Sequence, residues 1–223
     1  MIRIEKTRYQ SLAIDALSIE PGVTSVIGAN GSGKTTLLKL CAGIYIPGSG
    51  SILVDGVEPR KTEIGWVNEF PDRNFLFDTP GDEIASPLRF QHLPRGEIAH
   101  RMEEIWKRFG MAGLTDRSVR ELSGGEKVLV ALAAAMITNP RVIILDECDS
   151  HLDFRTVQRI DRILGDSSIP YVLKSTQDME NAKESDRVVF LEDNRVRLSG
   201  KPGEVFSELR ETPFYPFSWK CRR

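Results

Sequence analysis

A glycine-rich segment near the N-terminus has the residue types and spacing of a phosphate site. Residues 28–35 read G-A-N-G-S-G-K-T and match the pattern G-x-x-x-x-G-K-[ST], between an apolar strand and a helix. Glycines let the backbone curl so that N–H groups face one anion, and the helix N-terminus adds partial positive charge. An ordinary glycine-rich turn before a helix is the alternative. The predicted nucleotide-binding residues are Gly28, Ala29, Asn30, Gly31, Ser32, Gly33, Lys34, Thr35 and Thr36.

Two of these side chains have separate tasks. The Lys34 ammonium would reach the β- and γ-phosphates, and we expect it to be a solvated loop charge until nucleotide binds. The Thr35 hydroxyl is suited to bind Mg²⁺, which prefers oxygen ligands. The segment therefore predicts a site for a nucleoside triphosphate with Mg²⁺.

Two carboxylates follow a continuous apolar run at residues 142–145. Such a run is typical of a central parallel strand that is buried on both faces, and ligands bind beyond the carboxyl ends of such strands. We expect Asp146 to hold Mg²⁺, directly or through water, and Glu147 to polarise the attacking water. The alternative is that the two acids simply begin the next loop.

A third motif, L-S-G-G-E at residues 122–126, precedes a strongly apolar helix. Its Ser-x-x-Glu spacing is that of a capping box, which marks a helix start. In addition, the Ser123 side chain and the free N–H groups of Gly124 and Gly125 would form an anion site, with Glu126 beside them. Because this segment lies far from residues 28–35 in sequence, we expect it to close over a γ-phosphate held by another subunit.

The elements that must position these motifs alternate along the chain. Short strands are predicted up to residue 27, a hairpin at 51–57, and further strands at 64–67, 142–145, 171–174 and 188–191. Between about 70 and 121 helical periodicity replaces the strand signals, notably at 97–109. The pattern predicts an α/β fold with a mixed, largely parallel central sheet, an N-terminal antiparallel β subdomain and an inserted helical subdomain. We assign one domain to residues 1–223, with 1–69 and 122–223 as core and β subdomain and 70–121 as helical subdomain.

The composition is typical of a globular protein, and the cysteines indicate a reducing compartment. The 223 residues are 40% hydrophobic and 28% charged, with a net charge of −2, which gives no support for a nucleic-acid partner. Cys41, Cys148 and Cys221 fit no metal spacing, so we expect three reduced thiols. The longest apolar run, 128–137, is too short to cross a bilayer and is predicted to be a buried helix. Work at a membrane would therefore require a partner.

Taken in order, the motifs resemble the ATP-binding cassette (ABC) family of P-loop NTPases. The phosphate loop, L-S-G-G-E, I-I-L-D-E and S-H-L-D at 150–153 follow the family's order over nearly the whole chain. Residues 69–74 resemble the Q-N-P-D-x-Q stretch of energy-coupling-factor and cobalt/nickel-type importer ATPases, and residues 200–206 resemble their G-x-P-x-E-V-F. The resemblance implies an ATPase with ATP and Mg²⁺ as cofactors. It further implies a second ABC subunit, identical or different, and an integral membrane transporter subunit as partners, at the cytoplasmic face of the cell membrane.

The resemblance also implies roles for two outlying residues. An aromatic near the N-terminus of such ATPases stacks on adenine, and Tyr9 is the candidate here; a strand-edge tyrosine is the alternative. Asp153 resembles the family's aspartate that touches the partner subunit, although it would also serve as the N-cap of the helix that follows.

Two departures from the family pattern affect the chemistry. Glu69 stands where the family has a glutamine that contacts Mg²⁺ and the water; its carboxylate can bind Mg²⁺ but adds negative charge beside the γ-phosphate. Gln177 stands where the family has a histidine; its amide can donate to the γ-phosphate but cannot ionise. A further difference is the apolar pair Val128–Leu129, where similar importers carry polar or basic residues. The candidate catalytic residues are thus Glu147, Gln177 and Glu69.

Three functions remain open from the sequence. The first is the energising ATPase of an importer, in which hydrolysis in a closed dimer drives a membrane subunit. The second, favoured by Glu69 and Gln177, is an ATP-gated dimerisation module with weak or lost hydrolysis. The third is a non-transport cassette acting on chromosomes or ribosomes, against which stand the missing coiled-coil heptads, second cassette and basic face. The sequence does not name a solute.

Overall fold

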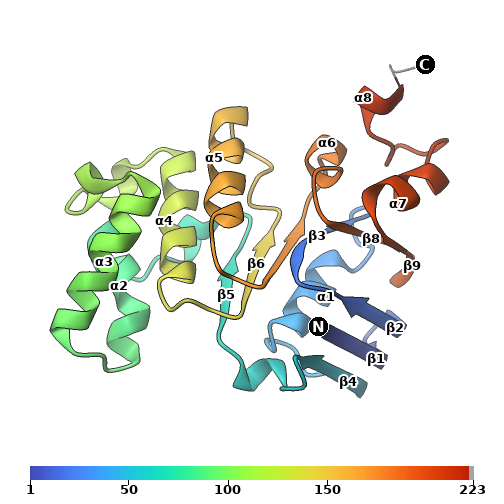
Figure 1. Cartoon of the computed structure of the whole chain (residues 1–223), viewed down its shortest axis with the longest axis horizontal. Coiled ribbons are helices and arrows are strands. Elements are labelled where there is room, and N and C mark those ends of the chain that lie inside the picture. The colour runs from blue at the N-terminus through green and yellow to red at the C-terminus, as the bar shows by residue number, and fades with distance from the viewer. Residues whose placement is uncertain (221–223) are drawn as a thin grey trace.

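The computed structural model, which describes residues 1–220, is built on one mixed sheet with nine strands in that range. Their spatial order is β4-β1-β2-β9-β8-β3-β7-β6-β5 (Figure 1). The strands are β1 (Ile2–Tyr9), β2 (Leu12–Ile19), β3 (Gly22–Ile27), β4 (Ser49–Val54), β5 (Ile64–Val67), β6 (Val142–Asp146), β7 (Tyr171–Ser175), β8 (Arg187–Glu192) and β9 (Arg195–Gly200).

The sheet has a parallel half and an antiparallel half. Strands β8, β3, β7, β6 and β5 run parallel to one another, and every residue of β6 and β7 is buried, as their apolar runs require. Strands β1, β2 and β4 are antiparallel, and a single parallel pair, Ala13 with Arg195, joins β2 to β9. The predicted fold class, a mixed and largely parallel sheet with an N-terminal antiparallel part, is confirmed.

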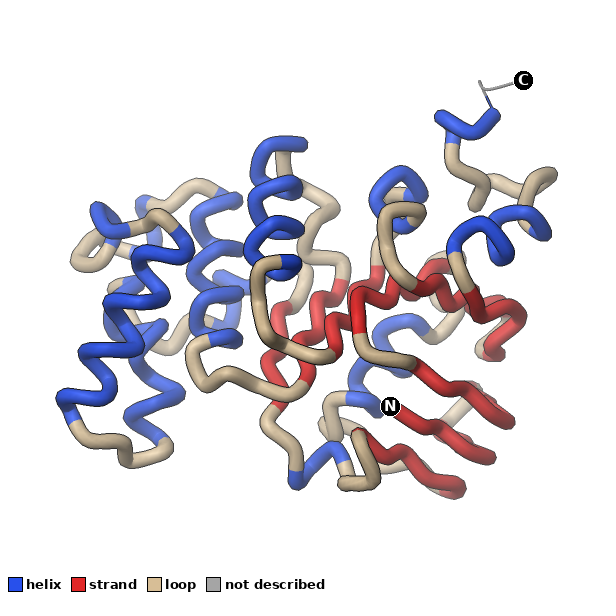
Figure 2. The backbone as a smooth tube through the Cα atoms, in the orientation of Figure 1, coloured by secondary structure: helices blue, strands red, loops and turns tan. Residues whose placement is uncertain are grey.

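Helices cover both faces of the parallel half and gather at one end of the molecule (Figure 2). Short 3₁₀ turns lie at 59–61, 71–74, 112–114 and 119–121. The helices are α1 (Lys34–Cys41), α2 (Pro80–Phe90), α3 (Arg95–Phe109), α4 (Gly124–Met136), α5 (Phe154–Gly165), α6 (Met179–Ala182), α7 (Pro202–Glu208) and α8 (Phe217–Lys220). No helix within residues 1–220 is long and apolar enough to cross a membrane.

The apolar core lies on both sides of the sheet. On one side α1 packs against β6 and β7, with Leu37 and Leu38 beside Ile144 and Leu173. On the other side α2, α3, α4 and α5 share one continuous cluster with Ile143. The helical segment at 70–121 therefore shares its core with α4, and its division from the rest of the chain stays a prediction.

The structure explains the apolar pair in α4. Val128 and Leu129 are 4% and 2% exposed and belong to the cluster that joins α4 to the helical segment. Burial is thus the reason that this position of the helix is apolar rather than basic. The buried helix predicted from the apolar run is α4 itself, which ends at Met136.

Some local predictions were wrong or incomplete. The predicted hairpin at 51–57 is reduced to one bridge, Val54 with Val57, because β4 pairs with β1 instead. Strand β9 and helix α7 were missed, since β9 alternates between exposed and half-buried residues and has no apolar run.

Cys41 and Cys148 are free and buried, as reduced thiols, and burial raises the pKa of each to about 12. Cys221 lies outside the described residues.

Candidate nucleotide-binding and hydrolysis site

The candidate site is a hollow of about 550 Å³ beyond the carboxyl ends of β3, β6 and β7. These strands are neighbours in the parallel half of the sheet, so the segments that follow them meet at one edge. The hollow is lined by Ser11, Asn30, Gly31, Gly33, Lys34, Thr35, Thr36, Glu69, Asp146, Glu147, Gln177 and Asn194. It therefore brings together the phosphate loop, both predicted acids and both departures from the family pattern.

The phosphate loop, residues 28–36, has a backbone that only glycine allows at two points. Gly28 has φ 146°, and a Cβ there would lie 2.2 Å from the Leu191 carbonyl oxygen. Gly33 has φ 99° and forms the N-cap of α1, so that the N-terminus of this helix opens onto the hollow. The buried Ser32 Oγ has no hydrogen-bond partner among the side chains and backbone groups that the structure describes. An unpaired buried hydroxyl and a helix N-terminus fit a phosphate group.

Lys34 is buried rather than solvated, so that part of the sequence prediction was wrong. The residue is 4% exposed, and its Nζ donates to the Gly28 and Ala29 carbonyls at 3.1 and 3.4 Å. The same Nζ lies 3.1 Å from Oε1 of Glu147. These three oxygens compensate the charge of the lysine and hold it at the floor of the hollow.

Oxygen groups suited to Mg²⁺ lie beside the loop. Thr35 Oγ1 donates to Oδ1 of Asp146 at 3.1 Å, and the buried Ser175 hydroxyl donates to the same oxygen at 2.7 Å. Glu69 lies at the rim, 44% exposed, with its Oε1 3.8 Å from Nε2 of His151. Among the side chains that the structure describes, those of residues 1–220 except Asp72, no three His, Cys, Asp or Glu gather as a metal cluster. The donor set of Thr35, Asp146 and Glu69 nevertheless fits Mg²⁺, which binds few protein oxygens and several from phosphate and water.

Glu147 is held in a strained backbone conformation. Its φ of 52° lies in the left-handed region, which disfavours residues with a side chain by about 1–3 kcal/mol. Its N–H donates to Ser175, with contacts of 3.0 Å to Oγ and 3.2 Å to the carbonyl oxygen. Ser175 therefore positions both acids at the end of β6, a role that sequence reasoning missed; a serine that ends a buried strand was the available signal.

Gln177 bridges the loops that follow β3 and β6. Its Nε2 donates to Oε2 of Glu147 at 2.8 Å and to Oδ1 of Asn30 at 3.1 Å. The Glu147 carboxylate thus contacts Lys34 through one oxygen and Gln177 through the other. The amide that would donate to a γ-phosphate is already directed at the candidate general base.

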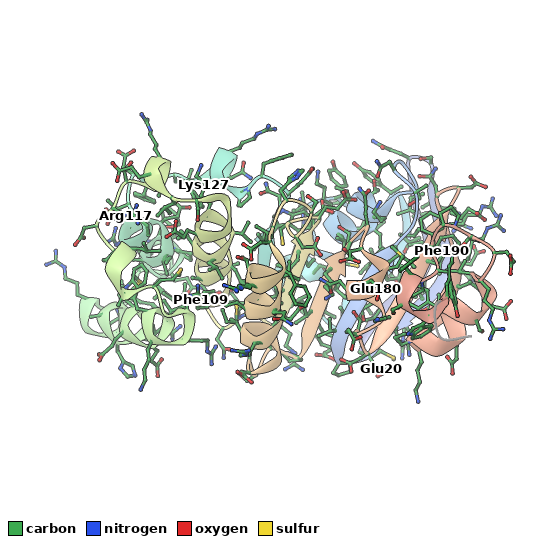
Figure 3. The ribbon with its side chains drawn as sticks, turned by 90° about the horizontal axis from the view of Figure 1, so that it is seen from above. Glu20, Phe109, Arg117, Lys127, Glu180 and Phe190 are labelled. Atoms are coloured by element: carbon green, nitrogen blue, oxygen red, sulfur yellow. The ribbon has the colours of Figure 1, made fainter. Side chains whose placement is uncertain are left out.

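The signature segment, Leu122–Glu126, lies away from this hollow in the same chain. Ser123 and Glu126 form the predicted capping box of α4, with Ser123 N and Oγ each donating to Oε2 of Glu126 at 2.8 Å. The Ser123 N–H and hydroxyl hold the pKa of Glu126 below its usual range. In Figure 3 Lys127, which follows the segment, lies over the helical end, whereas Glu180, three residues past Gln177, lies toward the other end of the molecule.

The two outlying residues of the sequence prediction, Tyr9 and Asp153, each contact a neighbour within this chain. Tyr9 stacks on Tyr45 with ring centroids 4.8 Å apart and is not among the residues that line the hollow, so its contact with adenine stays a prediction. Asp153 is the N-cap of α5 and accepts from the Thr156 N–H at 3.0 Å. Its contact with a partner subunit also stays a prediction.

Comparisons with known proteins agree with this geometry. The family model described as ABC transporter matches residues 15–150. The chain is 32% identical over 228 residues to the energy-coupling factor transporter ATP-binding protein EcfA1 of Mycoplasma mobile, covering 94% of this chain and 83% of the relative. It is 37% identical over 197 residues to EcfA1 of Lacticaseibacillus paracasei, covering 84% and 71% of the two chains.

Solved structures give the same result. The cbiO1 protein of Clostridium perfringens, which is part of the ABC transporter complex cbiONQ, matches with a TM-score of 0.84 at 30% identity over 94% of this chain and 93% of its own. The dimeric cassette MJ0796, bound to ADP and phosphate, shares the fold with a TM-score of 0.79 at 24% identity over 91% and 99% of the two chains. With its phosphate loop, paired acids and signature segment on this fold, the chain belongs to the ABC transporter family of ATP-hydrolysing cassettes.

Proposed function

We propose that the chain is the ATPase subunit of an energy-coupling-factor-type importer. One observation carries this proposal: Lys34, Asp146 and Glu147 line one hollow, while Ser123 and Gly124 of the signature segment are exposed elsewhere in the chain. A single chain thus offers two halves of a nucleotide site that do not meet within it. The named relatives are ATP-binding proteins of such transporters.

The site residues divide the work of ATP hydrolysis. Lys34 and the N-terminus of α1 bind the phosphates, and Thr35, Asp146 and Glu69 hold Mg²⁺. A Mg²⁺ ion held by these residues would supply positive charge to stabilise the negative charge that develops on the phosphate oxygens. Glu147 orients the attacking water and accepts its proton.

The second subunit completes the site. Ser123, Gly124 and Gly125 of a second cassette, identical or different, close over the γ-phosphate, and Asp153 contacts that subunit. Closure and reopening of the dimer drive an integral membrane transporter subunit. The assembly then lies on the cytoplasmic face of the membrane, where ATP is available. In this proposal residues 70–121 form the helical subdomain of the cassette. The partners are proteins, and no nucleic acid takes part.

A slow hydrolytic cycle is the second candidate, and the contacts of Glu147 favour it. Lys34 contacts one oxygen of the Glu147 carboxylate and Gln177 contacts the other, so the attacking water must compete with both side chains for its acceptor. A general base that must first release a hydrogen bond or ion pair activates water more slowly. In this version the chain closes on ATP as a dimer but turns it over at a low rate.

Isolation of the complex tests the proposal. The tagged chain is purified from detergent-solubilised membranes, the integral proteins that accompany it are identified, and phosphate release is measured in that complex. The expected result is one or more transporter subunits, a second cassette, and hydrolysis that Glu147→Gln abolishes. A chain recovered without any integral protein, or a complex whose hydrolysis survives Glu147→Gln, contradicts the proposal.

A further inference from the structure

A lysine lies in the buried centre of the sheet. Lys174, the fourth residue of β7, is 6% exposed, and β7 is hydrogen-bonded to β3 on one side and to β6 on the other. A buried ammonium is costly unless it is paired and hydrogen-bonded. The roles assigned above to the site residues use no amine at this position, so its charge needs a separate explanation.

A chain of five polar side chains explains how the charge is held. Lys174 Nζ lies 3.3 Å from Oδ1 of Asp161 on α5 and donates to Oδ1 of Asn181 on α6. Asn181 Nδ2 donates to Oδ2 of Asp149 at 3.3 Å, and Thr176 Oγ1 donates to the same oxygen at 3.0 Å. Since an ammonium only donates and a carboxylate only accepts, the orientation of the Asn181 amide between them is fixed.

The inner carboxylate of this chain is held away from water. Burial raises the pKa of Asp149, while the hydrogen bond from Thr176 and the charge of Lys174 act in the opposite direction. The Asp149 carboxylate is therefore stabilised by these two neighbours, Thr176 and Lys174. Thr176 itself is 1% exposed and lies between the two loops.

The chain ends beside the two residues that carry the hydrolytic roles. Asp149 lies two residues after Glu147, on the loop that follows β6, and Thr176 directly precedes Gln177, on the loop that follows β7. Between these loops Gln177 Nε2 contacts Oε2 of Glu147 at 2.8 Å. A change in the separation of the two loops would change this contact.

We propose that Asp149 and Lys174 are positioning residues for ATP hydrolysis, because their network locks the loop after β6 to the loop after β7 and so fixes Glu147 against Gln177. The inference rests on the roles proposed above for these two site residues. The phosphate loop follows β3 and leads into α1, and its Lys34 keeps its hydrogen bonds to the Gly28 and Ala29 carbonyls when the contact with Glu147 is lost. Loss of the network therefore impairs hydrolysis and leaves ATP affinity intact.

Substitutions at Thr176 test the network without removing a charge. Thr176→Val deletes the hydroxyl that donates to Asp149 and accepts from the Asp178 N–H, whereas Thr176→Ser keeps both contacts. We expect Thr176→Val to lower kcat for phosphate release about tenfold or more, with KM for Mg-ATP within about twofold of the parent value. Thr176→Ser retains the parent kcat. A Thr176→Val chain with the parent kcat overturns the proposal.

A remote threonine provides the matched control. Thr7 is fully buried in β1 and donates to the Ser51 carbonyl at 3.1 Å, so Thr7→Val deletes a comparable buried hydroxyl far from the two loops. It is expected to lower the melting temperature as Thr176→Val does and to leave kcat unchanged. If both variants lose kcat in proportion to their loss of stability, the effect is general destabilisation and the positioning role is wrong.

A double substitution removes both buried charges together. Asp149→Asn with Lys174→Met removes one negative and one positive charge and leaves only the half-exposed Asp161 without its partner, so this variant is expected to fold. Its kcat should remain about tenfold or more below the parent value, because Asn181 loses both the Lys174 ammonium and the Asp149 carboxylate that hold it. Parent-like turnover in a folded double variant contradicts the proposal.

Hydrogen exchange of the full chain provides a test that does not depend on hydrolysis. In Thr176→Val, backbone exchange should accelerate in both 147–153 and 176–181 and stay unchanged in 28–36. Acceleration in only one loop, or in neither, overturns the lock. If Thr176→Val shows the expected exchange in both loops but the parent chain does not hydrolyse ATP, the function proposed above is contradicted while the contact between the loops is supported. Failure of the positioning role and failure of the proposed function are therefore distinguishable.

Discussion

Nζ of Lys34 lies 3.1 Å from Oε1 of Glu147, and the two side chains are 4% and 18% exposed. The cation of the phosphate loop and the candidate general base therefore form one ion pair at the floor of the hollow. Ion pairs shielded from water are sensitive to the loss of either partner. This contact joins the phosphate-binding lysine to the water-activating acid, and removal of either side chain leaves the other without this partner.

Removal of the lysine should remove most of the affinity for ATP. Lys34→Ala deletes the full positive charge of the loop and is expected to weaken ATP affinity by about 2–4 kcal/mol. Titration calorimetry with Mg-ATP measures this loss. Lys61→Ala, which breaks an exposed ion pair with Glu58, is the control and should bind ATP as the parent does. Equal affinity of Lys34→Ala and the parent would remove the phosphate-loop assignment.

Neutralisation of the base should separate binding from hydrolysis. Glu147→Gln removes the negative charge beside Lys34 and the proton acceptor together, so ATP binding should hold or tighten while phosphate release falls about a hundredfold or more. With ATP, this variant should sediment as a closed dimer.

The closed dimer should depend on the signature segment. In the Glu147→Gln background, Ser123→Ala is expected to prevent ATP-dependent dimer formation and to destabilise α4 by about 1 kcal/mol through loss of its cap. Thr79→Ala removes the corresponding cap of α2 and should leave the dimer intact. A chain that stays monomeric under all conditions, alone and with candidate partner cassettes, would exclude the sandwich mechanism.

Replacement of the two unusual residues should speed hydrolysis. Gln177→His supplies an ionisable group beside Glu147 and should raise turnover about tenfold. Glu69→Gln in that background removes a negative charge from the rim of the same hollow. Steady-state phosphate release of the parent, Gln177→His, Glu69→Gln and the double variant at saturating Mg-ATP measures both effects, which should not be additive because both side chains line one site. If both changes slow the enzyme, the site is adapted to Glu69 and Gln177.

Stability should fall in acid through Glu180. The pKa of this carboxyl is lowered from 4.5 to about 2, first by the hydrogen bond from Lys183 and then by the Ser218 N–H. A carboxyl with a depressed pKa in the folded state stabilises the fold above about pH 4.5 and loses this contribution as the pH falls toward 2. Melting temperatures of the parent and Glu180→Gln between these limits should therefore converge as the pH falls. A constant difference would exclude the linkage.

Local patterns were sufficient to predict the parts of the site that are continuous in sequence. The phosphate loop, the acids after β6 and the capping box of α4 each depend on a few neighbouring residues, and the structure places them at the expected element ends. The pairing of Lys34 with Glu147 and the hydroxyl contacts of Ser175 join segments that are far apart in sequence. No local period encodes such contacts, because they depend on which strands become neighbours in the sheet.

The same limit explains the errors in the fold. Strand β9 has arginines and half-buried residues in alternation, and only its pairing with β8 makes it a strand. At 51–57 the sequence has hairpin turn residues, but β4 is hydrogen-bonded to β1, and Asp55 is occupied by Arg141 and Tyr171. Tertiary partners therefore overrode a turn signal that was locally correct.

At position 147 catalytic activity requires a carboxylate side chain, whereas the left-handed backbone conformation favours glycine. A glycine there would relieve the strain at φ 52° and lose the carboxylate, whereas an alanine would lose the carboxylate and keep the strain. Of two equally inactive variants, Glu147→Gly should thus unfold at the higher temperature. The residue that gives this cassette its base is one that the fold alone would not select there, so natural selection for turnover must act continuously to retain it.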